Sequence, residues 1–136
     1  MIIGVPLRSQ VLTIQVSKPD STVDFDIHEE ILRTHSRFFD NALAKDRQDT
    51  VRLRYPEDDP VDFEVYARWL YTGTISLDTP NQGSAMADDE RIRRFKTEMS
   101  KLTKLFALAH ILLHHDFCDA VLDTLIACSV HYKYTN

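Results

Sequence analysis

The most constraining feature of the sequence is an aromatic segment bounded by a helix start and a helix stop. Asp59 and Pro60 form the start, because the carboxylate can accept hydrogen bonds from the first turn and proline needs no hydrogen-bond partner for its nitrogen there. Gly73 can take the left-handed conformation that commonly ends a helix. Between them, apolar residues recur at helical spacing: Phe63, Tyr66, Ala67, Leu70 and Tyr71. The sequence therefore predicts one capped helix whose aromatic side chains, Trp69 among them, the rest of the chain must bury.

Three short segments alternate apolar and polar residues in the way that is typical of half-buried β-strands. Residues 12–16 and 23–27 do so on either side of a turn-forming segment at 17–21, which predicts a β-hairpin. Residues 51–55 repeat the alternation and predict a third strand. Strands and helices on one short chain predict an α+β fold.

Two short helices are expected between the second and third strands. Glu29 and Glu30 suit the first turn of one helix, where negative charge is favourable, and Ser36 is a typical cap for the next. In the second short helix, four apolar residues are expected to face inward: Phe38, Phe39, Ala42 and Leu43.

The C-terminal part of the chain predicts a loop and two longer helices. Residues 78–90 are small and polar and predict an exposed loop. Apolar residues then keep a helical period to about residue 113, and the adjacent histidines 114–115 break it. Asp116 caps the last predicted helix, which is expected to turn four residues inward: Cys118, Val121, Leu122 and Leu125.

Composition narrows the class of protein. At 136 residues, 43% of them apolar, the chain suits one globular domain. The net charge of −5 argues against a nucleic-acid binder, and no apolar run reaches the ~20 residues needed to cross a bilayer. Cys118 and Cys128 would lie ~15 Å apart on one helix, too far for a disulfide. Reduced thiols predict an intracellular protein, cytoplasmic or nuclear.

The central segment also resembles a known family. The run from Pro56 to Pro60, with Phe63 and the sequence Trp69-Leu70-Tyr71-Thr72-Gly73-Thr74-Ile75, is similar to the middle of a BTB/POZ domain of the type common in fungal proteins. The similarity extends to residues 25–28, 51–53 and 105–109, and to Ile31, Leu32, Ser36, Phe38 and Phe39.

The resemblance implies a division of the chain. A BTB/POZ domain, with a small, mostly antiparallel sheet and packed α-helical hairpins, is expected over residues 10–128. An N-terminal tail or exchanged strand is expected at 1–9, and a C-terminal tail at 129–136.

The resemblance implies a non-catalytic protein-interaction module that acts by self-association, by partner recruitment as an adaptor or scaffold, or by both. It implies no catalytic residue, cofactor or metal. The alternative within the family is a substrate adaptor of a cullin-type ubiquitin ligase. There the family often has a hydrophobic-x-Glu motif, whereas this chain has Leu43-Ala44-Lys45. A lysine in place of the glutamate presents the opposite charge, so cullin binding is expected to be weak or absent.

Partner-binding residues are expected at two places. One is the pair Leu43 and Lys45. The other is an apolar strip formed by Ile2, Ile3, Val5 and Leu7, which can add as a strand to the sheet edge of a neighbour. The charge pair that many strand-exchanged BTB dimers carry is missing, since residues 9–11 read Ser-Gln-Val and Glu29 follows the histidine. The apolar strip nevertheless predicts a homodimer through residues 1–8.

The histidines near the last helix offer the alternative of a metal-binding protein. His110 and His114 are four residues apart on one helix face, and His115, Asp116 and Cys118 are close in sequence. Zinc needs a third or fourth ligand with its own supporting hydrogen bond. Since Cys118 belongs to the apolar face, the favoured interpretation is a polar turn between two helices.

An enzyme is the other alternative. His28 and His35 flank a short helix that lies beside Ser36, Glu29 and Glu30. A Ser-His-acid triad needs a nucleophile on a strained turn and an oxyanion hole, and the sequence has no Gly-x-Ser-x-Gly motif and only three glycines. In the family, His28 is a structural position at a strand–helix junction.

Overall fold

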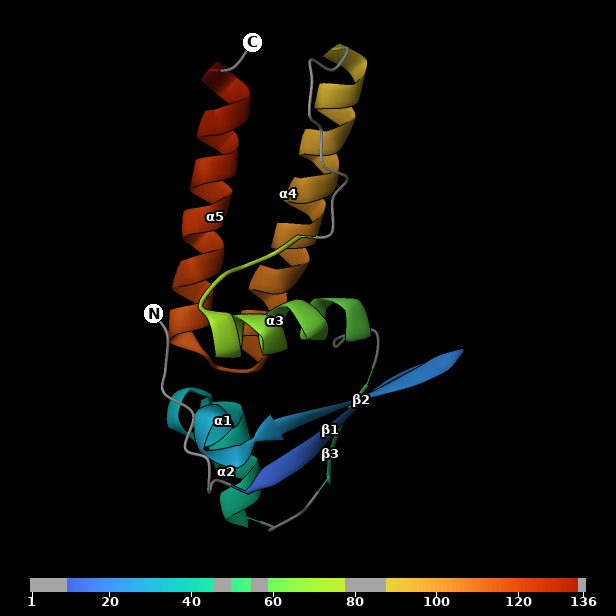
Figure 1. The fold of residues 1–136 in the computed structure, drawn as a ribbon, viewed down its shortest axis with the longest axis vertical. Coiled ribbons are helices and arrows are strands. Elements are labelled where there is room, and N and C mark those ends of the chain that lie inside the picture. The colour runs from blue at the N-terminus through green and yellow to red at the C-terminus, as the bar shows by residue number, and fades with distance from the viewer. Residues whose placement is uncertain (1–9, 46–49, 55–58, 78–87, 135–136) are drawn as a thin grey trace.

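The computed structural model describes residues 10–45, 50–54, 59–77 and 88–134. Over these ranges the chain is an α+β fold with a three-stranded sheet and five helices. The elements are β1 (Val11–Lys18), β2 (Ser21–His28), α1 (Glu29–His35), α2 (Arg37–Lys45), β3 (Thr50–Arg54), α3 (Pro60–Thr72), α4 (Asp88–Ile111) and α5 (His115–Tyr134). Figure 1 shows α3 between the sheet and the base of a long α4–α5 hairpin, which projects away from the sheet.

The sheet has the order β2-β1-β3, and its central strand is paired differently on its two sides. β1 and β2 form the predicted antiparallel hairpin, with Ile14 opposite Phe25. β3 runs parallel to β1 and places Val51 opposite Ile14. The sheet is therefore mixed, and its longer pairing is antiparallel, in keeping with the mostly antiparallel sheet that the resemblance implied. The α1–α2 pair returns the chain to the end of the sheet at which β1 begins, so β3 takes the direction of β1.

The predicted caps of α3 are confirmed. The carboxylate of Asp59 accepts a hydrogen bond from the N–H of Val61 at 2.9 Å, and Pro60 opens the helix. Gly73 has a φ of 73° and donates its N–H to the carbonyl of Trp69 at 2.8 Å. Since both ends are fixed by local chemistry, the helix presents its aromatic stripe to the core: Phe63, Tyr66, Trp69 and Leu70 are all buried.

The junction between β2 and α1 is held by α3. The backbone N–H of His28 donates to the hydroxyl of Tyr71 at 3.0 Å, and the Nδ1 atom of His28 lies 2.8 Å from the same hydroxyl. Tyr71 therefore joins α3 to the strand end that precedes the short helices. This contact gives His28 a structural role, as the resemblance implied.

The α4–α5 hairpin differs from the prediction at both of its free ends. α4 begins at Asp88, inside the predicted loop at 78–90, and residues 78–87 lie outside the described residues, as does the tail at 1–9. α5 continues through Tyr134, so residues 129–134 are helical where a C-terminal tail was expected. No helix in the described part of the chain combines the length and apolar character needed to span a membrane.

Candidate functional site

Two chain segments that are far apart in sequence, the start of α2 and the turn between α4 and α5, meet through hydrogen bonds. The N–H groups of Arg37 and Phe38, at the start of α2, donate to the carbonyls of Leu113 and Leu112 at 3.3 and 3.4 Å. The hydroxyl of Ser36 donates to the carbonyl of Leu112 at 2.7 Å. A helix start has free N–H groups and a helix end has free carbonyls, so the two ends satisfy each other. This contact brings the end of α1 against the α4–α5 turn.

Ser36 also confirms a predicted cap. Its hydroxyl oxygen accepts a hydrogen bond from the N–H of Phe39 at 3.3 Å, within the first turn of α2. Because the same hydroxyl is fully buried and donates to Leu112, it is not exposed as a nucleophile. His28 bonds to Tyr71 instead, so the structure does not assemble the Ser-His-acid set that the sequence raised as an alternative.

The turn itself directs His114 into the protein. Leu113 has a φ of 50°, a left-handed conformation that costs a non-glycine residue about 1–2 kcal/mol. The N–H groups of Leu113 and His114 donate to the carbonyls of His110 and Ala109 at 3.2 and 3.1 Å, which closes the end of α4. His114 consequently turns inward, with 2% of its surface exposed, while His110 is exposed.

His114 sits at the centre of an aromatic cluster. Its Nδ1 atom lies 2.9 Å from the hydroxyl of Tyr66, and its ring meets that of Trp69 edge-on at 5.2 Å between centroids. The ring of His35 stacks on it at 5.6 Å and within 6° of parallel. The pKa of His114 is lowered to about 4: burial is the largest cause, the neighbouring His35 adds to the lowering, and Asp116 opposes it. His114 is therefore a neutral imidazole at neutral pH.

Three potential metal ligands converge at this cluster. Nδ1 of His35 lies 3.4 Å from a carboxylate oxygen of Asp116. His35, His114 and Asp116 each offer one ligand atom within 4.8 Å of the others. The Nε2 atom of His114 is buried, and no hydrogen-bond partner reaches it among the described residues.

All three residues are candidates in the sequence, but they fall into two separate groups, one of possible metal ligands and one of possible catalytic residues. The sequence paired His114 with His110 and Asp116, and it paired His35 with His28 and Ser36. The structure leaves His110 on the outer side of α4, where its Nδ1 lies 3.1 Å from the carbonyl of Phe106. No periodicity signals that α1 ends beside the α4–α5 turn, because that contact is made by backbone groups and the hydroxyl of Ser36.

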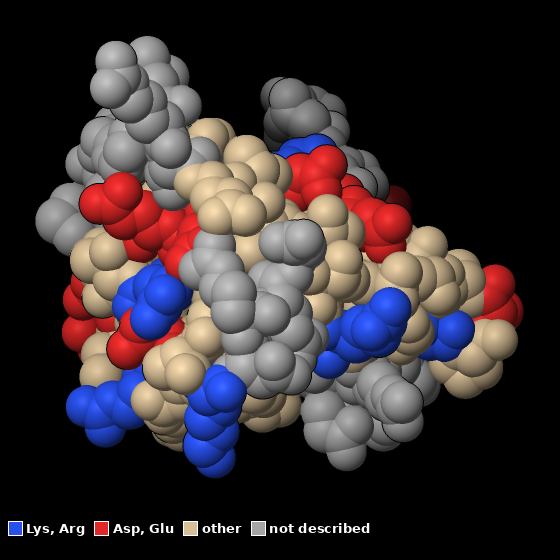
Figure 2. Space-filling view, turned by 90° about the horizontal axis from the view of Figure 1, so that it is seen from below, with Lys and Arg blue, Asp and Glu red and all other residues tan. Residues whose placement is uncertain are grey.

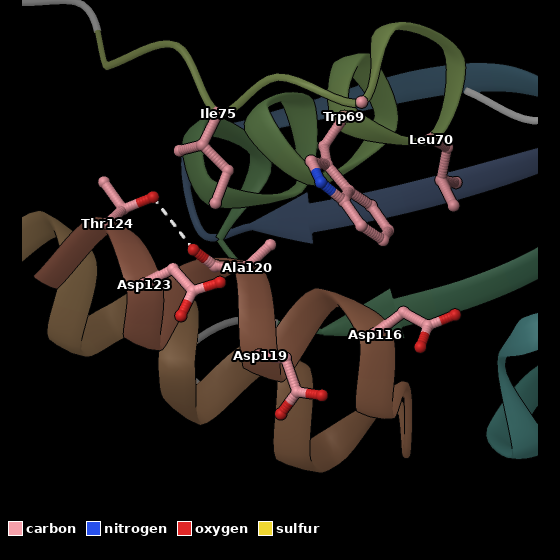
Figure 3. Close-up of a pocket in the computed structure, with 9 residues that line it drawn as sticks. Trp69, Leu70, Ile75, Asp116, Asp119, Ala120, Asp123 and Thr124 are labelled. Carbon is pink, nitrogen blue, oxygen red and sulfur yellow. Dashed lines mark hydrogen bonds between the residues drawn. The ribbon is translucent and has the colours of Figure 1, made fainter. Parts of the chain in front are cut away.

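A pocket of about 500 Å³ adjoins the same cluster between the end of α3 and the first turns of α5. Figure 3 shows Trp69 and Ile75 extending toward α5 across it. Its other wall carries Asp116, Asp119 and Asp123, whose spacing places them on one side of the helix. One apolar wall and one acidic wall suit a group that is both cationic and partly apolar.

The outer face of α5 is apolar over its C-terminal half. Leu122, Ile126 and Val130 follow at four-residue steps and are 39%, 62% and 50% exposed. The sequence had predicted that Leu122 faces inward together with Val121. Only Val121 is buried; Leu122 lies about 100° further around the helix, which at this position places it on the exposed side of α5. We call Leu122, Ile126 and Val130 the α5 stripe.

Of the partner-binding residues predicted from the sequence, two lie among the described residues. Leu43 is 3% exposed and packs in the core, so its side chain is not accessible to a partner protein. Lys45 is exposed at the end of α2. The strip of Ile2, Ile3, Val5 and Leu7 lies outside the described residues.

The two thiols are poor candidates for nucleophilic chemistry. The pKa of Cys128 is raised to about 12, chiefly by burial and also by Glu98, which accepts a hydrogen bond from the sulfur at 3.2 Å. Burial also raises the pKa of Cys118. Since the thiolate is the reactive form, neither cysteine is activated at neutral pH.

No family model matches the chain, and neither does any curated protein. What the site can do is therefore inferred from its geometry. That geometry offers a ligand cluster at His35, His114 and Asp116, an acidic pocket next to it, and an apolar stripe on a projecting helix.

Proposed function

We propose that this chain is a non-catalytic protein-interaction module of the BTB/POZ type that binds protein partners and a second copy of itself. The observation that carries the proposal is the α5 stripe. Three large apolar side chains on one outward helix face are a typical docking surface for another chain. The stripe lies on the hairpin that projects from the domain, where a partner can reach it (Figure 1).

The order of the elements supports the BTB/POZ assignment. A strand that ends at His28 is followed by two short helices, a third strand, the capped helix α3 and a helix pair. This is the succession that the resemblance implies. The resemblance remains an analogy at the level of the fold, so the function is argued from the surface.

Charge supports self-association. On α5, the exposed carboxylates of Asp119 and Asp123 lie before Ile126 and Val130, the last two residues of the α5 stripe. On α4, exposed Arg93 and Lys96 lie beside Ile92, which is 54% exposed. The α4 surface of one copy therefore has both the basic and the apolar groups that suit the α5 surface of another. Elsewhere the charges are mixed: Figure 2 shows Lys and Arg interspersed with Asp and Glu on the face that it displays.

Light scattering tests the proposal, and the full chain is expected to be a dimer at micromolar concentration. Replacing both Ile126 and Val130 with glutamate should weaken the dimer by at least ~100-fold, because each apolar side chain buried at an interface contributes ~1.5–3 kcal/mol. Val61→Glu is the matched control, since Val61 is a single apolar residue, 63% exposed, on α3.

Deletion of residues 1–8 separates the two candidate interfaces. A dimer that persists after the deletion and is lost in the Ile126/Val130 variant would assign the contact to α5. The opposite pattern would assign it to the strip of Ile2, Ile3, Val5 and Leu7, as predicted from the sequence. A full-length chain that stays monomeric would overturn the self-association part of the proposal.

A further inference from the structure

We propose that His35, His114 and Asp116 form a binding site for a divalent transition-metal ion, and that Zn²⁺ is the ion they fit best. This site is independent of the interaction surface on α5. It draws one ligand from the end of α1, one from the α4–α5 turn and one from the first turn of α5.

The spacing of the ligand atoms suits a shared ion. Two ligands at the usual 2.0–2.1 Å from a tetrahedral zinc ion lie about 3.3 Å apart. Nδ1 of His35 and the carboxylate oxygen of Asp116 are already at 3.4 Å. That distance is long for a hydrogen bond but matches one edge of such a tetrahedron. The ligand atoms lie within 4.8 Å of one another, so a pair at that limit must move about 1.5 Å closer together to bind one ion. The side chains of His35 and Asp116 are 20% and 52% exposed and have room to rotate.

The unsatisfied nitrogen of His114 is the second observation. A buried polar atom without a hydrogen-bond partner destabilises a protein, so it needs a physical explanation, and a bound ion is one such explanation. Nε2 of His114 is such an atom among the described residues. Its other ring nitrogen is engaged by the hydroxyl of Tyr66 at 2.9 Å. A metal-ligating histidine typically donates this second N–H to an oxygen, which fixes the ring orientation and leaves Nε2 with a free lone pair.

The donor set and the surroundings favour zinc. Two imidazoles and one carboxylate match the three protein ligands of open zinc sites, in which water or another ligand takes the fourth position. Tyr66 and Trp69 pack around His114 and favour an ion with few ligands over an octahedral one. Asp116 also lines the adjacent pocket (Figure 3). The open position can therefore face that pocket.

Bound zinc would tie the N-terminal half of the domain to the helical hairpin. His35 is the last residue of α1, whereas His114 lies in the α4–α5 turn and Asp116 in the first turn of α5. These two parts already meet through backbone hydrogen bonds between α2 and the α4–α5 turn. An ion that binds only the folded arrangement must stabilise it, and it does so in proportion to the logarithm of its concentration.

Isothermal titration of the full chain with Zn²⁺, after removal of metals by a chelator, tests the site. We expect one ion per chain and a rise in melting temperature with zinc concentration. Substitution of Co²⁺ should give the visible absorption of a four-coordinate cobalt ion. His35→Gln and Asp116→Asn should each weaken zinc binding by at least tenfold. Both side chains are partly exposed, so folding is expected to survive, and circular dichroism checks it.

His110→Gln and His115→Gln are the matched controls, because both histidines are exposed and lie outside the ligand set. They should leave the affinity unchanged. Zinc binding that is equally strong in wild type, His35→Gln and Asp116→Asn would place the ion elsewhere and overturn the proposal. So would the absence of measurable binding to the wild-type chain.

Discussion

Replacing Trp69 with alanine is expected to lower the free energy of unfolding by about 3–5 kcal/mol. Trp69 is 7% exposed and lies where α3 packs on α5. Its ring centroid is 5.0 Å from that of Phe117 and 5.2 Å from that of His114. Alanine would leave a cavity between the two helices. Domains of this kind are stable by only about 5–15 kcal/mol in total, so the loss would be a large fraction of the whole.

Urea unfolding followed by circular dichroism measures this loss. Trp69→Phe should cost less than the alanine variant, because phenylalanine keeps an aromatic ring in the same space. Val61→Ala is the surface control on the same helix and should change stability by less than about 0.5 kcal/mol, since Val61 is 63% exposed. A Trp69→Ala variant as stable as that control would show that the α3–α5 contact is not formed.

The sequence predicted α3 well because the signals that define it are local. Asp59, Pro60 and Gly73 act within one turn of the helix ends and need no distant partner. The β1–β2 hairpin was predicted for the same reason, since the alternation and the turn lie in one stretch. The direction of β3 was not, because it depends on which end of the sheet the helix pair returns to.

The candidate metal site could not be predicted for a different reason. His35 and His114 are brought together by hydrogen bonds from the backbone of α2 to the α4–α5 turn, and backbone groups carry no sequence signature. Leu43 shows the limit of the resemblance: helical periodicity placed it inward, the family motif placed it at a partner surface, and the structure agrees with the periodicity.

Acid is expected to destabilise the domain through His114. The pKa of His114 is lowered to about 4 in the folded protein, against an ordinary value of 6.5. Between about pH 6.5 and pH 4, His114 is therefore protonated in the unfolded chain but neutral in the folded chain. The stability that His114 contributes is complete above about pH 6.5 and is lost as the pH falls through about 4. The full difference is about 3 kcal/mol, and about 2 kcal/mol of it appears between about pH 7.5 and pH 5.

Urea unfolding at these two pH values, with a chelator present to exclude bound metal, measures the effect. His35, Asp116 and His115 surround the same ring and also influence the charge on it. The informative quantity is therefore the difference between wild type and His114→Gln, which keeps a polar group beside Tyr66 but cannot take up a proton. His110→Gln should behave as wild type, because His110 is exposed. If wild type and His114→Gln lose equal stability between the two pH values, His114 is not shielded from solvent, and the neutral ring that the cluster requires is absent.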